Sequence, residues 1–142
     1  APRDFQLSVR KSMSLKIEGS LPSFENSFHF HAIAKYRSKV FSPEIAERTE
    51  ALLFEKSKEL GWTIVEFAAD EDHIHFLIKS DSEPSQIAHR LFGYSSFALR
   101  KEFPELKELN KNQFWASEQC NCISNKSHYD NTVAYIKRHQ KV

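Results

Sequence analysis

The 142-residue sequence is poor in residues that break or cross-link a chain, with 3 glycines, 5 prolines and 2 cysteines. So little glycine and proline excludes a linker or low-complexity chain, and two cysteines exclude a disulfide-rich secreted scaffold. Cys120 and Cys122 stand two apart in a run that is typical of a strand. We interpret them as two half-buried strand thiols, because a C-x-C pair without a second pair is a weak metal motif.

Long apolar runs and a charge excess of one sign are also missing. No run approaches the ~18 apolar residues that span a bilayer, and the N-terminus lacks the pattern of a secretory signal. We therefore expect a soluble, cytoplasmic protein with no membrane partner. Because the net charge is only +1, any nucleic-acid binding must come from local clusters of Lys and Arg.

The composition that remains is that of an ordered globular protein. Hydrophobic residues make up 40% of the chain and include 12 phenylalanines, which indicates a well-filled core, and the length suits one such core. Residues 1–22 carry several cations and end in a Gly, Ser and Pro segment ahead of the first strand signal. We predict an N-terminal arm over 1–22 and one folded domain over 23–142.

Hydrophobic periodicity and local start and stop signals predict the elements of this domain. Apolar or alternating runs predict strands over 28–36, 62–69, 73–79 and 114–123. Caps and breakers predict a helix over 43–60, a second one from Ser82 and Pro84 to before Pro104, and a last one from Ser127 onward. The second helix has in register Ile87, Leu91, Tyr94, Phe97 and Ala98. The order βαββαβ followed by α predicts an α+β fold, a ferredoxin-like sandwich with an antiparallel sheet and an additional C-terminal helix.

Two histidine pairs with the spacing H-x-H are candidates for a metal site. His73 and His75 fall in the third predicted strand, where the period of two places both rings on one face of a rigid element. His29 and His31 have the same spacing in the first predicted strand, so spacing alone does not choose between the pairs. The second pair directly follows three acidic residues, whereas the first runs on to the basic segment KYRSK.

The last predicted helix carries two further candidates, Tyr135 and His139. They are four residues apart, so they share a helix face and can reach one common point. Gln140 is turned about 100° further round the helix, which makes His139 the better third metal ligand. The alternative interpretation is an ordinary amphipathic tyrosine beside a solvated terminal histidine.

A basic segment follows the first predicted strand. Lys35, Arg37 and Lys39 occupy every second position, and in an extended chain they would form a one-sided stripe suited to a DNA backbone. Tyr36 between them could stack on an unpaired base. The alternative is an ordinary solvated strand end.

Three segments, in order and spacing, resemble a known family. AKYRSKVF, DHIHFLI and AYIKRHQ are similar to the signature of HUH-type single-tyrosine transposases, which the smallest bacterial and archaeal insertion sequences encode. The resemblance extends from about Phe28 to Gln140. It implies that His73 and His75 are metal ligands, that Tyr135 is the nucleophile, and that the residue four beyond it, His139, is the third ligand.

The same resemblance implies an enzyme that cleaves and rejoins single-stranded DNA through a 5′-phosphotyrosine, with a divalent metal ion as cofactor. Three imidazoles favour Mn²⁺ or a softer ion, whereas Mg²⁺ is the abundant cellular ion. Family members often have Gln at the third-ligand position. His139 is thus a departure from that pattern, and the neighbouring Gln140 leaves this ligand open.

The expected partners are single-stranded DNA with hairpin ends and a second copy of the chain. In the expected homodimer, the tyrosine helix of one subunit completes the metal site of the other. Three alternative functions stay open: an HUH replication or conjugation initiator, less favoured because no extra domain is visible; a non-catalytic RNA- or DNA-binding module; and a domesticated transposase that only binds hairpins.

Overall fold

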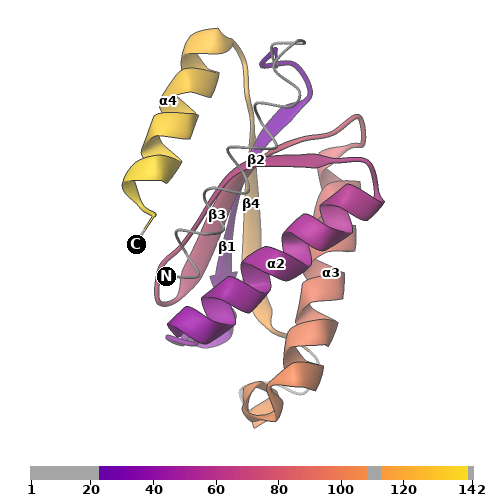
Figure 1. Cartoon of the computed structure of the whole chain (residues 1–142), viewed down its shortest axis with the longest axis vertical. Helices are drawn as coiled ribbons and strands as arrows, with labels where there is room; N and C mark the ends of the chain where they lie inside the picture. Colours follow the sequence, from indigo (N-terminus) through magenta and orange to yellow (C-terminus); the bar gives the residue numbers. More distant parts are fainter. Residues whose placement is uncertain (1–22, 109–112, 141–142) are drawn as a thin grey trace.

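Alternating strands and helices build one antiparallel sheet with helices on both of its faces (Figure 1). The computed structural model describes residues 23–108 and 113–140, so the arm predicted over 1–22 lies outside the described residues. The sheet has the order β2-β3-β1-β4. Its strands and the segments between them are β1 (Ser27–Ala34), η1 (Lys35–Arg37), α2 (Pro43–Glu59), β2 (Thr63–Ala69), β3 (His73–Lys79), α3 (Pro84–Glu102), η2 (Pro104–Glu108), β4 (Trp115–Cys122) and α4 (Lys126–Arg138). This order and pairing confirm the predicted ferredoxin-like α+β fold with an additional helix.

The helices begin at capping residues, although not always at the predicted ones. The Ser42 hydroxyl accepts a hydrogen bond from the Ile45 amide, and α2 starts at the next residue, as predicted. The N-cap of α4 is Asn125, two residues before the expected Ser127, because the Asn125 side chain accepts a hydrogen bond from the His128 amide at 2.8 Å. The predicted cap at Ser127 is therefore wrong, and Ser127 lies inside the helix.

The period of two divides the sheet residues between two cores. Phe30, Phe67 and Phe76 point toward α2 and α3, and Phe76 stacks on the other two with ring centres 5.5 and 6.4 Å apart. On the opposite face a smaller apolar cluster joins β2 and β3 to α4, and it contains Ala68, Leu77, Ile123, Tyr129 and Ile136. Since α4 packs on β2 and β3, the odd-numbered side chains of β1 lie at its margin.

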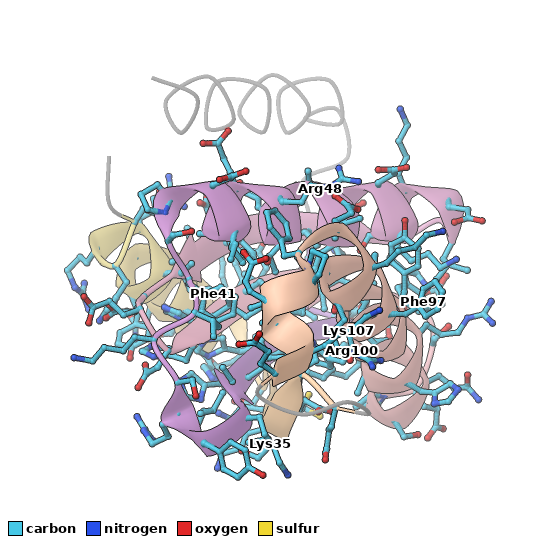
Figure 2. All side chains as sticks on the ribbon, turned by 90° about the horizontal axis from the view of Figure 1, so that it is seen from below. Lys35, Phe41, Arg48, Phe97, Arg100 and Lys107 are labelled. Carbon is cyan, nitrogen blue, oxygen red and sulfur yellow. The ribbon has the colours of Figure 1, made fainter. Side chains whose placement is uncertain are left out.

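Helix α3 buries a slightly different face from the one its sequence indicated. Phe92 is buried, whereas Phe97 is 63% exposed, so Phe97 was wrongly placed with the apolar face. Phe97 lines a pocket of about 740 Å³ together with Arg100, Lys101, Lys107 and Glu108. Figure 2 labels Phe97, Arg100 and Lys107. None of the predicted site residues lines this pocket.

Strand β4 lies at one edge of the sheet and carries both cysteines. Cys120 is half-buried against the larger core, and burial raises the pKa of its thiol to about 11. Cys122 is exposed, and both thiols are free, so only one of the two matches the predicted half-buried state. No helix in the described part of the chain is long and apolar enough to cross a membrane.

Candidate active site

The two histidine pairs belong to one surface. Strands β1 and β3 pair in a register that sets His31 directly opposite His75, so all four rings project from the same face of the sheet. The ring centres of His31 and His73 are 4.8 Å apart, and His29 Nε2 lies 3.3 Å from His75 Nδ1. The pairs that appeared as alternatives in the sequence are therefore neighbours, and His29 and His31 are members of the cluster that spacing alone did not identify.

Helix α4 adds a tyrosine and a further histidine to this cluster. The ring of His75 lies 5.3 Å, centre to centre, from the rings of both Tyr135 and His139, and these two are 4.4 Å from each other. Tyr135 is 43% exposed, while the next residue, Ile136, is fully buried against the sheet. The helix thus places the phenol at the surface above the histidines, and the ring of His73 lies 6.1 Å from that of His75.

The side chain of Gln140 takes a different direction from that of His139. Its amide nitrogen donates to Glu66 Oε1 at 2.8 Å and to the Phe67 carbonyl at 2.9 Å, which ties it to β2. His139 Nδ1 lies 2.8 Å from the Tyr135 carbonyl. Because a carbonyl can only accept, Nδ1 carries the proton and Nε2 keeps its lone pair. The geometry therefore favours His139 over Gln140 as a metal ligand.

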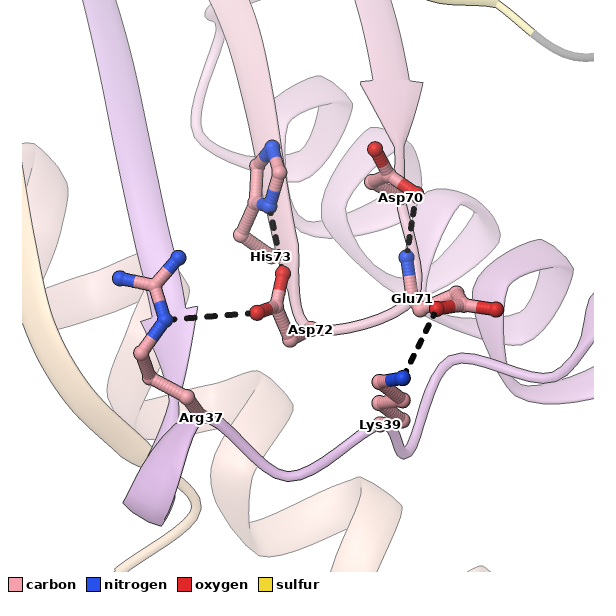
Figure 3. A network of polar contacts seen from close by, with 6 residues as sticks. All are labelled: Arg37, Lys39, Asp70, Glu71, Asp72 and His73. Carbon is pink, nitrogen blue, oxygen red and sulfur yellow. Dashed lines mark hydrogen bonds and ion pairs between the residues drawn. The ribbon is translucent and has the colours of Figure 1, made fainter.

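The other outer histidine, His73, is oriented by a carboxylate. Asp72 Oδ1 lies 2.8 Å from His73 Nδ1, so the carboxylate accepts a hydrogen bond from Nδ1–H and the lone pair of His73 Nε2 is left available. Arg37 contacts the second oxygen of Asp72 at 3.4 Å (Figure 3). The hydrogen bond from His73, together with the charges of His73 and Arg37, lowers the pKa of Asp72. Only the position of Asp72, directly before the H-x-H pair, hinted at this role in the sequence.

The basic segment after β1 is a turn rather than an extended stripe. Tyr36 and Arg37 have φ values of 61° and 50°, in the left-handed region, and η1 forms a 3-10 turn there. The expected extended geometry is wrong, because this backbone sends successive side chains in different directions. Lys35 reaches Gln113 at 3.1 Å, and Lys39 reaches Glu71 at 3.7 Å. The predicted DNA-binding residues thus lie together at a turn beside His73.

Burial keeps the central imidazoles neutral. His75 is 2% exposed, and its burial first, then the neighbouring His29 and His139, lower its pKa to about 3. Burial, with smaller effects of His31 and His128, lowers the pKa of His29 to about 4. The pKa of His31 is lowered by burial and by His73. A neutral imidazole is the form that binds a metal ion, so near pH 7 these rings are available as ligands.

The imidazole nitrogens of this cluster are suitable ligands for a divalent ion, although their rings do not converge on a single point. Across residues 23–108 and 113–140, no group of three or more His, Cys, Asp or Glu side chains is arranged to hold a metal ion. His73 and His139 nevertheless each direct Nδ1 to an acceptor and keep Nε2 free. Such oxygen partners on the remote nitrogen are typical of metal-binding histidines.

Comparison with known proteins agrees with the fold and identifies the family. The family model described as "Transposase IS200 like" matches residues 23–139. No curated protein matches the chain. A crystal structure of a Deinococcus radiodurans R1 protein assigned as a transposase superposes with a TM-score of 0.63 at 21% identity, covering 82% of this chain and 92% of that chain.

A second solved structure shows the same fold. It is a REP-associated tyrosine transposase bound to a REP hairpin, with a TM-score of 0.60 at 16% identity, and the match covers 78% of this chain and 64% of that chain. The family model extends over most of the present sequence, from Ser23, four residues before β1, through the whole of α4. The chain therefore belongs to the IS200-like transposase family.

Proposed function

We propose that this transposase cleaves and rejoins single-stranded DNA with Tyr135 as its nucleophile. One observation carries the proposal: α4 places the exposed ring of Tyr135 5.3 Å from the ring of His75, beside the histidines of β3. An amphipathic tyrosine with a structural role would bury its ring in the core. Here Ile136 fills the core, and the phenol stays accessible to a DNA strand.

The reaction exchanges one phosphate ester bond for another and so retains the bond energy. The Tyr135 oxygen loses its proton and attacks the scissile phosphorus, the bond to the 3′-oxygen breaks, and that oxygen takes up a proton. The products are a 5′-phosphotyrosine and a free 3′-OH. A different 3′-OH can then attack the same phosphorus and release Tyr135, so the strands are rejoined without ATP.

We propose that His73, His75 and His139 hold one divalent ion, Mg²⁺ or Mn²⁺, for this reaction. When bound, such an ion neutralises the phosphate oxygens and stabilises the charge that develops in the transition state. The chain's part is to keep His75 neutral through its lowered pKa, and to fix the Nδ1 atoms of His73 and His139 on oxygen acceptors so that Nε2 of each ring faces away from them. The side chains of His73 and His139 both reach the surface, so their rings can turn toward a common ion.

The DNA substrate is proposed to be single-stranded, with hairpin ends. The similar REP-associated transposase is bound to a hairpin, and in this chain an exposed Tyr36 and the cations Lys35, Arg37 and Lys39 surround the turn beside His73. The ammonium of Lys35 lies 5.5 Å from the centre of the Tyr36 ring. Cations next to an aromatic ring suit phosphates flanking an unpaired base.

A homodimer that shares its active sites is also proposed. Within one chain, α4 packs on its own sheet through Ile136 and Tyr129. The connection from β4 to α4 comprises residues 123–125, and a change of backbone direction there would deliver the same apolar face to the identical surface of a second copy. Two subunits supply two nucleophiles, which suits the cutting of both ends of a mobile element.

The proposal is tested with Tyr135→Phe and labelled single-stranded DNA from the flanks of the encoding gene. The parent should form a protein–DNA adduct that resists denaturant when Mg²⁺ or Mn²⁺ is present. The Phe variant should lose the adduct and keep DNA binding, because only the hydroxyl is removed. Phe in place of Tyr36, Tyr94 or Tyr129 should leave the adduct intact.

Other outcomes separate the alternative functions. An adduct in Tyr135→Phe would assign the nucleophile to another tyrosine. A parent that binds hairpins but never cleaves them with either ion would indicate a non-catalytic or domesticated protein. A parent that nicks DNA and never rejoins it to a second 3′-OH would indicate an initiator-type nickase.

A further inference from the structure

The last residue of β1 and the segment that follows it are tied to the turn between β2 and β3 at several points. Two of the ties are backbone hydrogen bonds: the Ala34 amide donates to the Asp72 carbonyl at 2.9 Å, and the Phe41 amide donates to the Glu71 carbonyl at 3.0 Å. Two more are the ion pairs of Arg37 with Asp72 and of Lys39 with Glu71 (Figure 3). The turn that precedes the proposed ligand His73 is thus held in place by the chain between Ala34 and Phe41.

The two ion pairs differ in their exposure to solvent and in the further partners of their carboxylates. The side chains of Lys39 and Glu71 are 77% and 65% exposed, so water screens that pair. Asp72 is only 22% exposed, and its two oxygens have separate partners: Oδ2 faces Arg37 at 3.4 Å, and Oδ1 accepts the Nδ1 proton of His73 at 2.8 Å. Asp72 therefore connects Arg37 to the imidazole of His73, a residue of the proposed metal site.

The backbone at Arg37 is unusual in a way that supports this arrangement. Arg37 and the preceding Tyr36 both have positive φ, which side chains with a Cβ rarely adopt. The Lys35 amide bonds the Phe114 carbonyl at 2.8 Å, and the Ser38 amide returns to the Lys35 carbonyl at 3.2 Å. The turn is held from both sides in a conformation that directs Arg37 back toward Asp72 rather than along the strand.

We propose that Arg37 is a positioning residue for the metal ligand His73, acting through Asp72. The guanidinium holds one carboxylate oxygen in place, so the other keeps the proton on His73 Nδ1 and leaves Nε2 available to a divalent ion. A carboxylate on the remote nitrogen orients a ligating imidazole and makes it a stronger donor. This inference rests on the proposed metal function, and it gives Arg37 a role that does not require DNA.

The first measurement is the affinity for Mn²⁺ by calorimetry, without DNA. Arg37→Gln and Asp72→Ala should each weaken binding by about tenfold or more, as losses of such outer partners do, and the double variant should be little worse than Asp72→Ala. Arg48→Gln is the matched control, because Arg48 also binds a carboxylate, Glu102 at 2.6 Å, but joins α2 to α3. It should bind Mn²⁺ like the parent.

The second measurement needs no metal ion. In ¹⁵N-histidine-labelled apo protein, the imidazole nitrogen shifts of His73, assigned by their loss in His73→Gln, should report the Nδ1–H tautomer in the parent. They should move toward the Nε2–H tautomer in Asp72→Ala and in Arg37→Gln. The backbone bond to the Asp72 carbonyl survives both changes, and circular dichroism checks that each variant is folded.

Two results distinguish the positioning role of Arg37 from the proposed metal function. If Arg37→Gln keeps the parent's Mn²⁺ affinity and His73 tautomer while losing affinity for single-stranded DNA, Arg37 is a direct DNA contact and the inference is overturned. If the parent itself binds no Mn²⁺, the proposed metal function is wrong.

Discussion

At the scale of single residues, His75 is the centre of the site. Its ring contacts the rings of His29, Tyr135 and His139, and it is almost completely buried. Burial of the ring first, and then the neighbouring imidazoles, disfavour its protonated form, and together they lower its pKa to about 3. The same burial that keeps this proposed metal ligand neutral therefore links the stability of the metal-free protein to pH.

We expect the metal-free protein to lose stability as the pH falls below about 6.5. In the unfolded chain His75 takes up its proton near pH 6.5, whereas in the folded chain it stays neutral down to about 3. Between these values the unfolded state binds more protons, so the free energy of unfolding decreases with decreasing pH, by about 3 kcal/mol at pH 4.5 for this residue. His75→Gln should show a shallower decrease in urea unfolding with EDTA. Equal slopes for parent and variant would contradict the assignment.

A second prediction at this scale concerns the third ligand. Calorimetric titration with Mn²⁺ should give one site in the parent, none in His75→Ala, and affinity weaker by on the order of tenfold or more in His139→Ala. Gln140→Ala should stay close to the parent, because the Gln140 amide is bound to Glu66 and Phe67. A site that survives His75→Ala and disappears in His31→Ala would instead lie on β1.

At the scale of elements, α4 connects packing to chemistry. Its apolar residues dock on β2 and β3, and this docking, together with the bonds of Gln140 to β2, sets the position of Tyr135 and His139 over the sheet. Ile136 is fully buried between the two catalytic candidates in the sequence. A change in the core of this helix should therefore reach the active site.

We expect Ile136→Ala to loosen α4 and to lower cleavage, although Ile136 contacts no substrate. Removing this side chain should cost about 2–5 kcal/mol of packing, seen in urea unfolding and in faster hydrogen exchange of the α4 amides. Lys126→Ala is the control on the same helix, since its pair with Asp130 is exposed and should contribute less than about 1 kcal/mol. Unchanged exchange in Ile136→Ala would show that other contacts hold the helix.

At the scale of the whole molecule, the question is which sheet each α4 binds. The single chain places Tyr135 beside its own His75, and an identical sheet in a second copy offers the same surface. Exchange between copies would keep the packing of α4 on β2 and β3 and change the backbone of the connector at residues 123–125. Both arrangements thus share one packing surface.

Mixing two inactive parents distinguishes them. A heterodimer of Tyr135→Phe with a subunit carrying His73→Ala and His75→Ala contains one intact tyrosine and one intact histidine pair, on different chains. If sites are shared, one working site should be recovered and cleavage should reach up to about half of the parent activity per dimer. No recovery, with heterodimers seen by mass spectrometry, would show that each subunit uses its own tyrosine.

Local patterns were sufficient for much of the fold and for the candidate residues. Alternation placed His73 and His75 on one face, the spacing of four joined Tyr135 to His139, and the signals at Ser42 and Gly61 bounded α2 to within one residue. These features depend on the geometry of one continuous backbone, whose period is the same wherever the segment lies. The sequence of a segment is then enough to determine them.

Only the tertiary structure decided how these segments meet. The register of β1 on β3 united two histidine pairs that spacing had left as alternatives, and the bonds of Gln140 to β2 turned it away from the cluster. The turn at Arg37, with its positive φ, replaced the extended stripe because contacts from Asp72 and Phe114 hold it. Such choices depend on packing and hydrogen bonds between segments far apart in the chain, and a local pattern contains no information about the partner it will meet.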